Sequence, residues 1–97
     1  MAAYSELVDL IQQPLFRKRI TYALWSCSVD VLNDVGASAG AKAFARKSLK
    51  GANADSDVIT HLAVRCVSNP TIAAAGANCT DADIRFVVAG AFSEVAA

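Results

Sequence analysis

Apolar residues between positions 15 and 34 recur at the spacing of a single long helix. One stripe has the spacing i, i+4, i+7 and i+11 and consists of Ile20, Leu24, Cys27 and Val31. A second stripe runs beside it and consists of Trp25, Val29 and Leu32. A helix that is apolar around so much of its circumference usually contacts other elements on several sides. We therefore expect this helix to be the centre of the fold.

The segment 81–96 has the clearest helical pattern in the chain. Its apolar face follows i, i+3, i+4, i+7, i+8 and i+11 and consists of Ile84, Val87, Val88, Ala91, Phe92 and Val95. Thr80 precedes it as the N-cap, and Asp83 completes an approximate capping box. Gly90 lies inside this helix, where glycine costs about 1 kcal/mol relative to alanine. We attribute Gly90 to a close approach of the helix 15–34, against which this helix should pack.

Three shorter segments also have helical spacing. In the segment 4–12, the predicted buried face consists of Tyr4, Leu7, Val8 and Ile11. A third helix follows Ser38, which can cap it, and continues to about Lys50. A fourth helix ends before Pro70, because the residue before a proline disfavours the helical conformation. Its predicted buried face consists of Ile59, Leu62, Ala63, Cys66 and Val67.

Residues 70–79 lack a sustained period, and we predict a loop or an irregular helical turn around Gly76, anchored by Ile72. No segment shows the alternation of a strand together with turn residues. The predicted fold is therefore all-α. It is a compact bundle of about five helices in one domain, residues 1–97, with a long central helix (about 15–34) packed against the C-terminal helix (about 81–96).

Composition and charge suggest that this small domain contacts other subunits. Of its 97 residues, 55% are hydrophobic and only 19% are charged, and much of the hydrophobic share is alanine. An alanine-rich chain packs its helices closely and leaves apolar surface for a partner, so we expect a homo-oligomer. The formal net charge is zero, which argues against a general nucleic-acid-binding protein. No apolar run approaches the roughly 20 residues that span a bilayer, so we expect no membrane partner.

The charges are unevenly divided between the two halves of the chain. Residues 1–50 hold seven Lys/Arg and four Asp/Glu residues, whereas residues 51–97 hold two and five. One interpretation is that these charges meet within the monomer or are solvated. Another is that the basic end of one subunit meets the acidic end of its neighbour, in a head-to-tail contact that can close a ring.

No arrangement of residues predicts catalysis, and we expect neither an enzyme nor a bound cofactor or metal. The three cysteines are widely spaced, and a structural zinc site needs four close Cys/His ligands. Cys79 lies at a helix start, which lowers a thiol's pKa, but Asp81 and Asp83 oppose this effect. His61, Asp57 and Arg65 are spaced as a surface salt-bridge ladder, which is the simpler alternative to an acid–base site.

The basic side chains are the best candidates for a partner-binding site. Arg17, Lys18 and Arg19 lie at the start of the long helix, where the helix dipole disfavours positive charge. A second group consists of Lys42, Arg46 and Lys50, which form one helical edge with Lys47 beside it. The two groups can form a solvated face, bind an acidic protein or bind nucleic acid. We predict that Arg17, Lys18 and Arg19 contact an acidic surface of a neighbouring subunit.

Several short motifs are similar to a family of small all-helical proteins among the virion structural proteins of tailed bacteriophages. These motifs are the basic helix start at 17–19, the sequence Phe44-Ala45-Arg46, the Asn69-Pro70 break, and Thr80-Asp81-x-Asp83-Ile84. The family's usual Trp-Ala pair in the third helix is Phe44-Ala45 here. The resemblance covers most of the chain.

The resemblance implies a non-enzymatic virion protein on the capsid or at the head–tail neck. Such a protein is assembled in the host cytoplasm and binds other virion proteins and copies of itself. The alternative interpretation is a small helical nucleic-acid-binding or regulatory protein. An enzyme is the least supported of the three classes.

Overall fold

The computed structural model describes residues 3–50 and 56–95, and its regular elements are all helical. They are α1 (Tyr4–Gln12), α2 (Pro14–Asn33), α3 (Ala39–Lys50), α4 (Ser56–Ser68), α5 (Pro70–Ala75), the 3-10 helix η1 (Gly76–Asn78) and α6 (Asp81–Val95). Within these ranges the chain contains no strand. The all-α prediction is therefore confirmed, and the predicted single long helix and C-terminal helix are α2 and α6.

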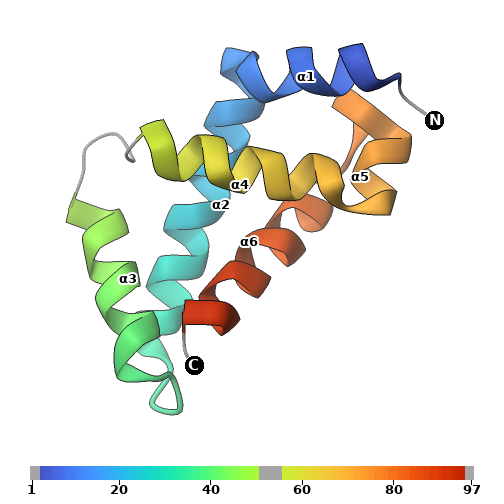
Figure 1. Cartoon of the computed structure of the whole chain (residues 1–97). Helices are drawn as coiled ribbons and strands as arrows, with labels where there is room; N and C mark the ends of the chain where they lie inside the picture. The colour runs from blue at the N-terminus through green and yellow to red at the C-terminus, as the bar shows by residue number, and fades with distance from the viewer. Residues whose placement is uncertain (1–2, 51–55, 96–97) are drawn as a thin grey trace.

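α2 is the central element, as the two apolar stripes predicted. It begins at Pro14, whose fixed φ suits a first helical turn and whose missing N–H would have no intrahelical partner there. It packs most extensively against α3 and α6, and also contacts α4 and α1. Figure 1 shows α3 and α6 on either side of α2, with α4 crossing it and α1 lying across its N-terminal end.

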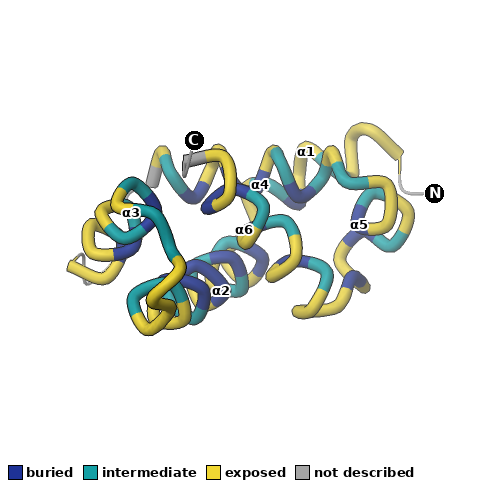
Figure 2. Tube along the Cα trace, turned by 90° about the horizontal axis from the view of Figure 1, so that it is seen from below, coloured by how far each residue is buried: buried dark blue, intermediate teal, exposed yellow. Residues whose placement is uncertain are grey.

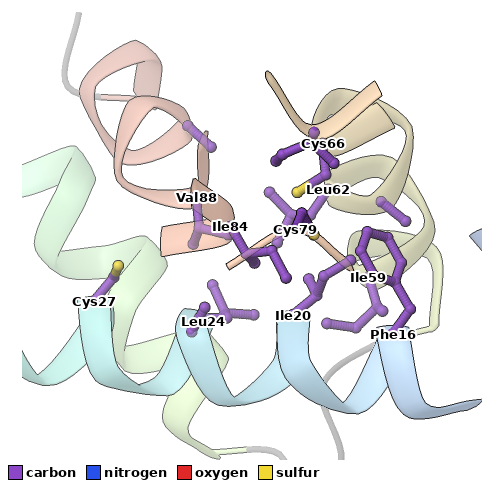
Figure 3. Close-up of a cluster of buried hydrophobic side chains, with 14 of the residues drawn as sticks. Phe16, Ile20, Leu24, Cys27, Ile59, Leu62, Cys66, Cys79, Ile84 and Val88 are labelled. Atoms are coloured by element: carbon purple, nitrogen blue, oxygen red, sulfur yellow. The ribbon is translucent and has the colours of Figure 1, made fainter. Parts of the chain in front are cut away.

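The first apolar stripe of α2 forms the core, whereas the second is only partly buried. Ile20 and Leu24 are fully buried, and Cys27 is nearly so. In Figure 3 these residues face the side chains of α6 and α4, including Ile84 and Leu62. The second stripe is less buried than predicted. Trp25 and Leu32 are half-buried, with Leu32 packed against the core, and Val29 is 47% exposed.

The start of α6 confirms the predicted capping box. The Thr80 hydroxyl accepts a hydrogen bond from the Asp83 backbone N–H at 3.1 Å, and Asp83 Oδ2 accepts one from the Thr80 N–H at 3.2 Å. The buried face of α6 is also confirmed by Ile84, Val88, Ala91 and Phe92. The explanation of Gly90 is wrong, however, because a Cβ added there would meet no atom within 4 Å.

Of the two forms predicted for the segment after α4, a loop or an irregular helical turn, the structure has the helical one, with α5 followed by η1. Asn69 Oδ1 accepts hydrogen bonds from the backbone N–H groups of Thr71 at 3.0 Å and Ile72 at 3.3 Å, and so caps α5. Ile72 is fully buried, which confirms its role as an anchor. Gly76 ends α5 with φ 60°, a conformation that favours glycine. These features make the bundle one of six α-helices in its described part.

The remaining three predictions concern the shorter helices. The Ser38 hydroxyl accepts a hydrogen bond from the Ala41 N–H at 3.1 Å, which confirms the cap of α3. In α1 the predicted face is confirmed only in part, because Leu7 and Ile11 are half-buried whereas Tyr4 is 83% exposed and Val8 is exposed. The fully buried residue of α1 is Leu10, which was not assigned to that face. α1 lies across the end of the bundle and buries only one edge, which Figure 2 shows as a short dark segment. The α4 face is confirmed, except that Val67 is half-buried.

Candidate interaction surfaces

Arg19 is bound within the chain. Its Nε donates to Asp81 Oδ1 at 2.8 Å, and its Nη2 donates to the Cys79 carbonyl oxygen at 2.6 Å. Its Nη1 reaches the Ala77 carbonyl oxygen at 3.4 Å. Arg19 thus joins α2 to η1 and to the first turn of α6. Burial opposes its charged form, but the hydrogen bond to Asp81 and the nearby charges raise the pKa of Arg19 above its ordinary value.

Arg17 is also engaged with neighbouring helices. Its Nη1 donates to the Ile11 carbonyl oxygen of α1 at 3.3 Å and to the Thr60 hydroxyl of α4 at 3.0 Å. Its side chain therefore joins α1, α2 and α4. Of the three basic residues that were predicted to meet a neighbouring subunit, Arg17 and Arg19 have structural roles inside this one.

A second ion pair joins α2 to α6 near the other end of their contact. Arg85 of α6 pairs with Asp30 of α2, and it also donates to the Ser26 hydroxyl. Both pairs place an α6 charge beside an α2 charge that opposes the α2 dipole. Arg19 near the positive end meets Asp81, and Asp30 near the negative end meets Arg85. The unfavourable charge placement in α2 is therefore offset within the monomer at these two positions.

The other basic candidates point to solvent. Lys18, Arg46, Lys47 and Lys50 are exposed, and Lys42 is half-buried. Among the described residues, none of these five side chains takes part in an ion pair. Lys42, Arg46 and Lys50 form one edge of α3, at the spacing that the sequence indicated, and we call these three residues the basic edge of α3. The structure thus separates the predicted partner-binding residues into an engaged set and an available set.

The cysteine thiols are poor nucleophile candidates. All three are free and buried. Burial raises the pKa of Cys66 to about 12, and the Cys79 thiol nearby adds to the effect while Arg65 opposes it. Burial also raises the pKa of Cys79, against the effect of Arg19. A thiol with a raised pKa stays protonated near neutral pH, and it is the thiolate that reacts.

In the predicted ladder of Asp57, His61 and Arg65, the Arg65 side chain pairs with another helix. Arg65 pairs across helices with Glu94 of α6, through two hydrogen bonds of which the longer is 2.8 Å. The hydrogen bond from Arg65 lowers the pKa of Glu94.

Within residues 3–50 and 56–95, no group of three or more His, Cys, Asp or Glu side chains could hold a metal ion.

An exposed apolar stripe runs along α2, and the sequence pattern did not predict it. Leu15, Tyr22 and Val29 are 70%, 74% and 47% exposed. A groove of about 430 Å³ runs beside the first two, and Ala23 and Ala82 contribute to its lining. The spacing of seven residues was visible in the sequence, but the strong core stripe of the same helix concealed it. We call Leu15, Tyr22 and Val29 the outer stripe of α2.

Comparisons with known proteins do not assign the chain to a family. No protein-family model matches it, and neither a curated protein nor a solved structure matches it significantly. None of the described helices is long and apolar enough to span a membrane. The described surface of the bundle thus carries exposed apolar side chains and exposed basic side chains.

Proposed function

We propose that the chain is a non-enzymatic structural protein of a tailed-phage virion, assembled in the host cytoplasm by repeated protein–protein contacts. Its place is at the head–tail neck or on the capsid. The motifs at 17–19, 44–46, 69–70 and 80–84 support this proposal through their resemblance to small virion proteins.

One structural observation carries the proposal. A bundle of this size exposes large apolar side chains on several helices, including Tyr22 at 74% and Phe86 at 75%. Scattered exposed hydrophobic residues are normal, but here they accompany basic side chains that have no ion pair in the described part of the chain. Such a surface suits a subunit that is covered by several neighbours in an assembly.

Quantitative mass spectrometry of purified particles tests this function. We expect the chain in particles of the phage that encodes it, at a copy number fixed by the symmetry of its position. About a dozen copies per particle place it in a neck ring, and on the order of hundreds place it on the capsid. Absence from purified particles that contain the other structural proteins contradicts the proposal.

The basic edge of α3 favours a second candidate function, a small nucleic-acid-binding or regulatory protein. Lys42, Arg46 and Lys50 share one side of a helix, which suits contact with a phosphate backbone. Binding of a labelled DNA duplex, measured at two salt concentrations, tests this candidate. Affinity that falls steeply with salt, and that is lost when the three residues are changed to Gln, supports it. Undetectable binding at low salt excludes it.

A further inference from the structure

The side of α3 that faces away from the bundle carries three basic side chains. α3 packs on the bundle through the side that holds Ala41 and Ala45, both of which are buried. A helix turns by about 100° per residue, so Lys50 lies opposite Ala41, with Arg46 and Lys47 on either side of Lys50. All three basic residues are exposed, and none has an ion pair in the described part of the chain. We call Arg46, Lys47 and Lys50 the outer cations of α3.

The exposed surface of α1 is acidic. Glu6 and Asp9 lie almost one turn apart on the same flank of this helix, and both are exposed. Neither has an ion pair within residues 3–50 and 56–95, and α1 contains no basic residue. Tyr4 and Val8 are also exposed, at 83% and 38%, so apolar surface accompanies the two carboxylates. We call Glu6 and Asp9 the outer carboxylates of α1.

These two charged surfaces lie at opposite ends of the molecule. The bundle is elongated, with extents of 41, 25 and 19 Å along its principal axes. Figures 1 and 2 both show α1 and α3 at different ends of it. Lys18 and Asp34 are exposed charges that do not follow this division, but they belong to neither helix. The outer cations and the outer carboxylates therefore stay unpaired within one chain, and a second copy can pair both.

We infer that α3 of one copy docks on α1 of the next copy, in a head-to-tail contact in which the outer cations of α3 meet the outer carboxylates of α1. Opposite charges at the two ends make the contact complementary, and the exposed Tyr4 and Val8 add apolar area to it. Each copy keeps one of the two surfaces for a further copy, so the contact repeats and gives a ring or an open chain. The inference rests on the proposed function and deepens it, since it names the surfaces through which the repeated contacts form.

The charge balance favours a second copy over a nucleic acid as the partner of α3. A nucleic acid would engage only the outer cations of α3 and would leave the carboxylates of α1 without a partner. A domain that binds nucleic acid usually carries excess positive charge, whereas the formal net charge of this chain is zero. At zero net charge, copies of the chain also have no overall repulsion to overcome.

Sedimentation velocity of the full chain tests the contact. We expect the wild type to associate at about 50 mM salt and to dissociate at about 500 mM, because salt screens exposed charges. The α1 variant carries Glu6→Lys and Asp9→Lys, and the α3 variant carries Arg46→Glu, Lys47→Glu and Lys50→Glu. In each variant the two surfaces have the same sign of charge. Each variant should therefore raise the dissociation constant at least about tenfold.

A control chain with Asp34→Lys, Ser68→Lys and Ser93→Lys separates the α1 surface from the net charge. These three positions are exposed and lie outside α1 and α3. The control and the α1 variant have the same formal net charge, +4, because replacing a carboxylate by lysine adds two charges and replacing serine adds one. The control should stay associated under conditions in which the α1 variant is monomeric. Circular dichroism checks that every variant keeps its helices.

Mixing the α1 variant with the α3 variant is the sharpest measurement, because the basic α1 of one chain then meets the acidic α3 of the other. We expect the mixture to associate although each variant alone is monomeric. A monomeric wild type at low salt, a variant that still associates alone, or a mixture that stays monomeric would overturn the inference. A monomeric wild type that binds DNA through the outer cations would assign them to a nucleic acid instead. Because these measurements use the isolated chain, the inference can fail while a fixed copy number in purified particles still supports the proposed function.

Discussion

α2 binds α6 and α3 by different means. At α6 the contact combines the buried core with two ion pairs, Arg19–Asp81 and Asp30–Arg85. At α3 the buried residues are small, with Ala41 and Ala45 at 5% and 0% exposure and Ser48 at 9%, and among the described residues no ion pair joins the two helices. Small side chains allow close backbone approach, but they leave the long basic side chains of α3 outside the contact.

The two contacts differ in whether their basic side chains are paired within the chain. The α2–α6 contact uses basic side chains to fix helices in place, and these side chains are not available to a partner. On the α3 side, Arg46 and Lys50 of the basic edge are exposed and Lys42 is half-buried, and none of them has an ion pair among the described residues. Arg17 and Arg19 therefore have structural contacts within the chain, whereas Lys18 and the basic edge of α3 have no ion pair among the described residues.

The largest expected effect on stability comes from Phe92 of α6, which contacts α3 and so links the two helices that pack on α2. Its ring packs edge-on against Phe44 of α3, with the ring centroids 5.0 Å apart and the planes at 75°. Phe92→Ala should lower the free energy of unfolding by about 3–5 kcal/mol, through lost burial and the cavity left behind. Urea denaturation followed by circular dichroism measures this change. Phe86→Ala is the matched control, because Phe86 lies on the same helix but is 75% exposed. Equal losses of stability in Phe92→Ala and Phe86→Ala would mean that Phe92 does not link α6 to α3.

Replacing Arg19 tests how much the ion-paired contact between α2 and α6 contributes to the stability of the fold. Arg19→Ala should destabilise the fold by about 1–3 kcal/mol, mainly because the partly buried carbonyl of Cys79 loses its charged donor. The pair with Asp81 contributes little by itself, since the Asp81 side chain is 86% exposed.

Lys18→Ala is the control for this measurement. Lys18 neighbours Arg19 in the sequence but is exposed, so the change should cost less than about 0.5 kcal/mol. Thermal unfolding of both variants in the same buffer compares them. If Lys18→Ala is as destabilising as Arg19→Ala, the division into engaged and available residues is wrong.

The parts of the fold that the sequence predicted are those that local rules determine. The core stripe of α2 and the capped, periodic α6 depend on residues within a few turns of one another. For residues 70–79 the sequence left a loop and an irregular helical turn as alternatives, because the six residues of α5 are too few to show a period, although Asn69 and Pro70 give its start signal. The buried face of α1 depends on how the helix crosses the end of the bundle, which its own sequence does not state.

The candidate site was harder to predict because its partners are distant in the sequence. Arg19 and Asp81 are separated by 62 positions, and Arg17 and Thr60 by 43. A run of three basic residues looks uniform in the sequence, yet the fold engages two of them and leaves the third exposed. The outer stripe of α2 was hidden because Tyr22 and Val29 are apolar residues in a helix already identified as central.

Gly90 offers a stabilising change on the α6 side. Because no atom lies within 4 Å of an added Cβ, Gly90→Ala fits without a clash. Alanine should raise the free energy of unfolding by about 0.5–1 kcal/mol, since it restricts the unfolded chain and suits a helix interior. The midpoint of urea unfolding measures this gain. A loss of stability would show that a second helix approaches Gly90 closely after all.

The smallest expected effect is at the basic edge of α3, and it completes the comparison with Arg19. Lys42→Gln, Arg46→Gln and Lys50→Gln should each change the free energy of unfolding by less than about 0.5 kcal/mol, because none forms an ion pair in the described part of the chain. Gln keeps the length and helix propensity of the side chain while it removes the charge. Urea unfolding at low salt is the most sensitive measurement, since exposed charges are least screened there. A loss above about 1 kcal/mol for any one of them would place that residue among the structural charges. If none of the three changes lowers the free energy of unfolding, the basic edge of α3 has no structural role that would prevent it from binding an acidic partner.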